Sequence, residues 1–144
     1  ARLAYTERDR LRGAVVHGGP VHGYFQREWQ MKALGTREYL FELFEARAAV
    51  YGVASLDDFL AYGPKMSLAT AGLLDKPSAP MFLINGLKDT QVPVDDLFLL
   101  MRSGDPKEVW INPEGGHMGR TSRLSDERIF ETVTLPWVVR RLKE

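Results

Sequence analysis

Three short strand-like runs, separated by longer segments of helical pattern, constrain the fold of this chain most strongly. The runs are AVV (14–16), MFLIN (81–85) and KEVWINP (107–113), and glycine or proline ends each of them. Continuous small and β-branched apolar residues are typical of strands that are covered on both faces, as in parallel sheets. Strands alternating with helices therefore predict a parallel α/β sheet with right-handed crossovers. Because three parallel strands make a thin sheet, we expect further strands along at least one edge.

Composition narrows the class of protein. The chain has 144 residues, of which 44% are hydrophobic, a content that can build the core of one domain. Nineteen basic residues balance nineteen acidic ones, which argues against nucleic acid and against an anionic membrane as partners. Cysteine is absent, so disulfides and thiolate metal sites are excluded. No apolar run approaches the roughly 20 residues of a membrane span, and no signal peptide is visible. We expect a soluble, cytoplasmic protein without a cofactor.

The region between the first and second strands reads as helical from residue 27 to about residue 76. One amphipathic helix is predicted over 36–52, with Gly52 as its C-cap. A second begins at Ser55, whose hydroxyl is a good N-cap ahead of two aspartates. The stretch 66–74 is predicted to form a third, short helix.

Helical patterns also flank the strands elsewhere. Residues 94–104 predict an amphipathic helix that closes on a glycine, and 125–144 predict a helix that Pro136 kinks or restarts. Residues 1–11 read as a helix with neither an N-cap residue nor an initiator methionine. We therefore expect the polypeptide to have been cut from something longer.

The residues that can carry chemistry follow the strands. In open α/β sheets, functional groups collect beyond the carboxyl ends of the strands. Asp89 follows the second strand, and His117, preceded by two glycines, follows the third. Neighbouring parallel strands would bring them together. A carboxylate that accepts from one imidazole nitrogen fixes the tautomer and leaves the other nitrogen free as a general base.

Structural explanations compete with each functional one. A lone loop aspartate usually forms a turn or is solvated, and a lone histidine is often incidental; the two together in successive strand-end loops favour a catalytic pair. His22, set further into the loop after the first strand, is a candidate substrate contact, whereas His17 at the strand end is predicted to pack or hydrogen-bond within the fold. A three-histidine metal site lacks adjacent ligand spacing, so we predict no metal.

PMFLINGLKDTQVPVDD (80–96) and EGGHMGR (114–120) resemble the last third of an α/β-hydrolase, in which the order along the chain is nucleophile, acid, histidine. Together with GAVVHGGPVHGYF (13–25), they are similar to the branch that holds the fermentation/respiration switch protein, fungal pigment-polyketide-shortening hydrolases and a nicotine-pathway C–C hydrolase. The resemblance implies that Asp89 is the triad acid and His117 the triad base. It also implies a hydrolase core over 1–26 and 79–144, with a helical cap inserted at 27–78.

One part of the family pattern is missing from the sequence. The family requires a serine in a G-x-S-x-G-type elbow upstream of both partners, and no such motif occurs. Residues 1–11 resemble the helix that follows the elbow, so the resemblance implies a serine a few residues before Ala1. The function expected is the C-terminal part of a serine hydrolase that cleaves an ester or a C–C bond next to a carbonyl. Its partners would be a small acyl or carbonyl substrate and the N-terminal half of the fold.

Two other functions remain open at this stage. The chain is alternatively a non-catalytic binding or interaction fragment, in which the unpaired edge of strand 14–16 would favour association, including homo-oligomers. It is alternatively part of a peptidase of the prolyl-oligopeptidase kind, although those enzymes place their extra domain upstream, unlike the insert at 27–78.

Overall fold

The computed structural model describes residues 1–35 and 43–144 of the chain. The helices are α1 (Arg2–Thr6), α2 (Arg27–Gly35), α3 (Leu43–Tyr51), α4 (Leu56–Met66), α5 (Val94–Arg102), α6 (Asp126–Ile129) and α7 (Leu135–Lys143), and the strands are β1 (Ala14–His17), β2 (Met81–Gly86) and β3 (Glu108–Asn112). Short 3-10 turns lie at Arg8–Arg10, Gly23–Phe25 and His117–Gly119. Within these described ranges, no helix is both long and apolar enough to cross a membrane.

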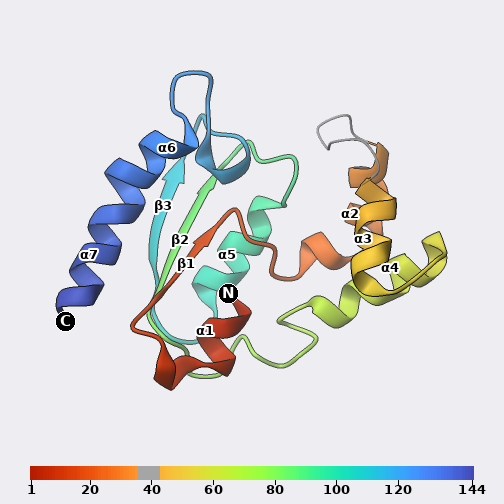
Figure 1. Cartoon of the computed structure of the whole chain (residues 1–144), viewed down its shortest axis with the longest axis horizontal. Coiled ribbons are helices and arrows are strands. Elements are labelled where there is room, and N and C mark those ends of the chain that lie inside the picture. Colours follow the sequence, from red (N-terminus) through yellow and green to blue (C-terminus); the bar gives the residue numbers. More distant parts are fainter. Residues whose placement is uncertain (36–42) are drawn as a thin grey trace.

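The three strands form one parallel sheet in the order β1-β2-β3. Val16 pairs with Leu83, and Leu83 pairs with Val109, so the three runs lie in register. The parallel α/β sheet predicted from the sequence is therefore confirmed. Since all strands point the same way, their carboxyl ends share one rim, from which the loops after the strands leave (Figure 1).

The central strand β2 is buried along its whole length because helices cover both faces of the sheet. Leu83 packs in a core with Leu97 and Leu100 of α5, on one face. Ile84, the next residue, packs on the other face with Ile129 and Trp137 of the C-terminal helices. This alternation is the period of two of a strand, and it places α5 and α6–α7 on opposite sides of β2 (Figure 1).

Helices α2, α3 and α4 lie together to one side of the sheet (Figure 1). Ser55 caps α4 as predicted, since its hydroxyl accepts the amide of Asp58 at 3.0 Å. Phe59 on α4 is fully buried, and its ring stacks on that of Tyr51 in α3. The predicted helix 36–52 is observed from Leu43 to Tyr51, while its first residues lie outside the described part of the chain.

The prediction of a short helix over 66–74 is wrong. The chain leaves α4 at Met66 and continues in turns. Ser67 directs the first of them, because its side-chain oxygen accepts the amide of Thr70 at 3.1 Å. Gly72 then adopts a left-handed φ of 61°, which breaks any helical path.

The C-terminal helix restarts near Pro136, as predicted from the sequence. Residues 130–134 form a wider π turn between α6 and α7, and Pro136 lies in the first turn of α7, where its missing N–H needs no partner. Trp137 then packs against the sheet and donates its indole N–H to Glu108 of β3 at 2.8 Å. This hydrogen bond fixes α7 to the edge strand.

Candidate active site

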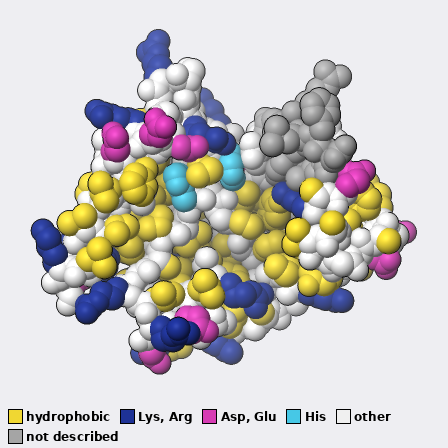
Figure 2. Space-filling model, viewed as in Figure 1, with side chains coloured by type: hydrophobic (Ala, Val, Ile, Leu, Met, Phe, Trp, Pro, Cys, Tyr) yellow, Lys and Arg dark blue, Asp and Glu magenta, His cyan; other side chains and the backbone are white. Residues whose placement is uncertain are grey.

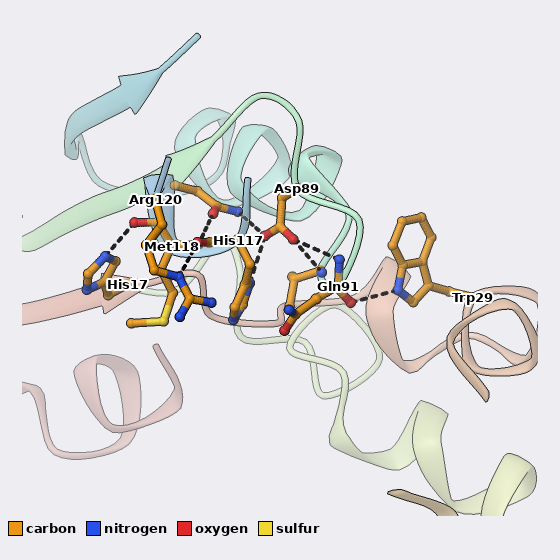
Figure 3. A network of polar contacts seen from close by, with 9 residues as sticks. His17, Trp29, Asp89, Gln91, His117, Met118 and Arg120 are labelled. Carbon is orange, nitrogen blue, oxygen red and sulfur yellow. Dashed lines mark hydrogen bonds and ion pairs between the residues drawn. The ribbon is translucent and has the colours of Figure 1, made fainter. Parts of the chain in front are cut away.

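Asp89 lies in the loop after β2, where its side chain has no exposed surface. One carboxylate oxygen, Oδ1, accepts the backbone amides of Gln91 and Val92 at 2.8 and 3.0 Å. This is an Asx-type turn, and it aims the other oxygen back toward the sheet. The same loop is held from outside by α2, because the indole N–H of Trp29 donates to the carbonyl oxygen of Gln91 at 3.1 Å (Figure 3).

The second oxygen of Asp89 meets the histidine that follows β3. Nδ1 of His117 lies 2.9 Å from Oδ2 of Asp89, so the predicted contact between the two side chains is present (Figure 3). An ionised carboxylate can only accept, so Nδ1 carries the proton and donates it. In neutral His117 the lone pair is therefore on Nε2, to which the described part of the chain offers no hydrogen-bond partner. The His117 side chain is 19% exposed, so part of it is open to solvent.

The surroundings of Asp89 keep it charged. Burial by itself raises the pKa of Asp89, but the hydrogen bonds from His117 and from the Val92 amide outweigh burial and lower the pKa below its ordinary value. The carboxyl is therefore ionised at neutral pH, and it stabilises an imidazolium when His117 takes up a proton.

Asn85, the penultimate residue of β2, ties the acid to the histidine loop. Its Nδ2 donates to Oδ2 of Asp89 at 2.8 Å, and its Oδ1 accepts the amide of Met118 at 2.9 Å. Met118 has a left-handed φ of 62°, which is costly for a residue with a side chain. Nε2 of His17 donates to the carbonyl oxygen of Met118 at 2.7 Å (Figure 3). Both peptide groups of Met118 are thus fixed, and they hold its neighbour His117 in place.

Two glycines make room for the histidine. A Cβ atom at Gly18, after β1, would lie 2.9 Å from Cε1 of His117, and the φ of 59° at this position also favours glycine. At the end of β2, a Cβ at Gly86 would lie 2.1 Å from the carbonyl oxygen of Gly115. The histidine loop therefore passes so close over the strand ends that side chains are excluded.

We expect Gly86→Ala to push the histidine loop away from β2. Because the added methyl group meets rigid backbone, the expected cost is about 1–3 kcal/mol of unfolding free energy, measured by urea denaturation, with a parallel loss of any turnover. Gly35→Ala is the matched control, because a Cβ there meets nothing within 4 Å. Equal stability of the two variants would contradict the close approach of the loop.

An open depression of about 230 Å³ lies in front of His117. Its walls include Gly18, Tyr24, Arg47 of α3 and Gln91, so it spans from the strand ends to the helices. Histidine side chains reach the surface at this end of the sheet, beside hydrophobic side chains (Figure 2). The depression is a place where a small molecule can meet Nε2 of His117.

Asp96, in the first turn of α5, shapes the wall that carries Tyr24. Its buried carboxylate accepts four backbone amides, those of Val21, His22 and Tyr24 on Oδ2 and that of Gly23 on Oδ1, at 2.6 to 3.2 Å. A single side chain therefore fixes the whole loop after β1. In the sequence Asp96 reads only as an acid that favours a helix N-terminus, so its clamp was not predicted.

His22, the predicted substrate contact, has polar partners other than Asp89 and His117. Its Nδ1 is 2.8 Å from the hydroxyl of Ser67 and 3.3 Å from Nε2 of Gln26. The depression in front of His117 is lined by other residues of this loop, and a substrate role for His22 stays a prediction.

A serine beside a histidine raises the question of a second nucleophile. Ser67 is completely buried, and its oxygen also accepts the amide of Thr70, so no substrate reaches it. Ser55 and Ser125 cap helices. Ser103 donates to a carbonyl oxygen of its own helix. Among the described residues, no three of the histidine, aspartate and glutamate side chains lie close enough together to hold a metal ion.

Comparison with known proteins identifies the fold. The sequence matches no protein-family model and no curated protein. Among solved structures, AbyA5 superposes with a TM-score of 0.75 at 21% identity, over 99% of this chain and 39% of AbyA5. The 2,6-dihydroxy-pseudo-oxynicotine hydrolase superposes with a TM-score of 0.55 at 17% identity, over 76% of this chain and 28% of the hydrolase.

The chain has an α/β-hydrolase-type fold, as the sequence predicted. It spans less than two fifths of the length of AbyA5, and the acid and histidine loops lie at the rim where such a fold collects its chemistry.

Proposed function

We propose that this chain supplies the acid and the base of a serine hydrolase that cleaves an ester, or a carbon–carbon bond next to a carbonyl. The single observation that carries the proposal is the 2.9 Å contact between Nδ1 of His117 and the buried Asp89. His117 also lines a depression large enough for a small substrate. The α/β-hydrolase-type fold supports the hydrolase class but not a particular substrate.

The proposed reaction follows from these positions. Nε2 of His117 removes the proton of the serine hydroxyl as its oxygen attacks the substrate carbonyl, and Asp89 stabilises the imidazolium that forms. His117 then protonates the leaving oxygen, or the leaving carbon in a C–C cleavage, and an acyl-enzyme remains. Water attacks this acyl group with His117 again acting as base, which regenerates the serine.

The nucleophile in this proposal is carried outside the 144 residues. The six serines of the sequence occur in no glycine-flanked elbow, and the four described above are buried or engaged in local structure. We further propose that 27–78 acts as a cap over the site and that 1–26 with 79–144 form the core. The position of α2–α4 beside the sheet and the placement of Arg47 on the wall of the depression support this division (Figure 1).

A fluorophosphonate probe tests the proposal in the complete protein that contains this chain. We expect one covalent adduct per molecule, on a serine outside residues 1–144, with the site identified by peptide mass spectrometry. An adduct on any of the six serines of this sequence, or no adduct at all, would contradict the proposal. Aryl-ester turnover without cleavage of peptide amides is expected, and the reverse preference would favour the peptidase alternative.

A further inference from the structure

The depression in front of His117 contains a second feature that the proposed reaction does not use, a positioned cation. Arg47 lies on α3 and lines the same depression as His117. Of the described residues that line it, Arg47 alone carries a permanent charge.

The guanidinium of Arg47 lies over the ring of Tyr24, which serves as its platform. Its Cζ atom lies 5.0 Å from the centre of the Tyr24 ring, within the range of a cation–π contact. Nη1 of Arg47 lies 3.5 Å from Oε1 of the buried Gln30, and Nε2 of Gln30 in turn donates to the carbonyl oxygen of Tyr24. The platform is itself fixed, because Asp96 accepts the amide of Tyr24.

A guanidinium held in this way is suited to one kind of ligand. Its planar fork matches the two oxygens of a carboxylate, and stacking on an aromatic ring reduces the entropy lost on binding. A depression of about 230 Å³ that both side chains line lets one small molecule contact Arg47 and Nε2 of His117 together.

We propose that the substrate carries a carboxylate that Arg47 binds while its scissile carbonyl faces His117. This inference rests on the proposed function and deepens it by assigning the substrate to the anionic acyl compounds. Arg47 is then a specificity residue of the depression.

A pair of esters tests this assignment in the complete enzyme. The 4-nitrophenyl monoester of glutarate offers a free carboxylate, and its methyl ester is the neutral counterpart. We expect the wild type to prefer the anion, and Arg47→Met to lower the ratio of the two kcat/KM values by about 10- to 100-fold, mainly through KM. Arg47→Lys should recover part of the ratio, because the charge returns without the planar fork.

Arg27→Met is the matched control, since Arg27 pairs with Asp57 on the exposed surface of the helices. It should keep the wild-type ratio. A ratio in Arg47→Met equal to that of Arg27→Met would overturn the assignment.

Binding measured without turnover separates this inference from the proposed function. Calorimetric titration with glutarate should give a Kd that rises about 10- to 100-fold in Arg47→Met. Arg47-dependent binding in a protein that hydrolyses neither ester would support the carboxylate site and contradict the hydrolase proposal. Ester turnover together with glutarate binding that is unchanged in Arg47→Met would support the hydrolase proposal and contradict the carboxylate site.

Discussion

Asp89→Asn is expected to lower kcat of the complete enzyme by about 10³- to 10⁴-fold while the fold is retained. The reason lies in the two oxygens of Asp89. Oδ1 accepts the amides of Gln91 and Val92, so the NH₂ group of an asparagine cannot occupy that position. It must replace Oδ2 instead, where it opposes the NH₂ group of Asn85, donates to Nδ1 of His117 and forces the ring proton onto Nε2. A histidine with Nε2 protonated cannot remove the proton of a serine.

The measurement is kcat with an aryl ester, together with the thermal melting temperature. Asp95→Asn is the matched control, because Asp95 is a nearby exposed acid in the first turn of α5. It should retain wild-type turnover. Near-normal turnover in Asp89→Asn would contradict a catalytic role of Asp89. A purely structural role of this carboxylate would not depend on the tautomer of His117.

Asp96→Ala is expected to cause the largest loss of stability, about 3–5 kcal/mol of unfolding free energy. The substitution leaves four backbone amides of the loop after β1 without their acceptor, and two of them, those of Val21 and Tyr24, are in buried residues. Each buried donor without a partner retains its desolvation cost. The wall that supports Tyr24 and Arg47 should loosen with it, so glutarate binding should weaken as well.

Urea denaturation measures this effect, with Asp95→Ala as the control for the loss of an acid near the helix N-terminus. We expect less than about 1 kcal/mol for the control. Asp96→Asn should fall between the two, because its amide oxygen can still accept the three N–H groups that bind Oδ2, while the NH₂ group opposes the amide of Gly23. Asp96→Ala as stable as Asp95→Ala would show that the clamp contributes little.

The meeting of Asp89 and His117 was predictable because it follows from topology. Two consecutive strands ending in polar loops, once recognised as parallel neighbours, place those loops at one rim. The apolar run before Asp89 and the glycines before His117 were enough to recognise them. His17, predicted to hydrogen-bond within the fold, does so with the carbonyl oxygen of Met118.

The parts of the site that were missed depend on contacts between distant segments. Asn85 at the end of a buried strand reads as a turn residue, yet its side-chain amide holds both the Asp89 loop and the His117 loop. Asp96 clamps amides more than 70 positions earlier in the chain. Arg47 belongs to a helix whose existence periodicity predicts, but the cavity that it faces depends on how α3 packs beside Tyr24. A local pattern does not encode these distances.

The hydrogen bond from Trp29 to the loop of Asp89 has a mechanical consequence. If a bulky ligand displaced α2 outward, this hydrogen bond would either break or pull the loop along with α2. In the second case Asp89 would move out of line with His117. We therefore expect the proposed site to accept small ligands more readily than bulky ones.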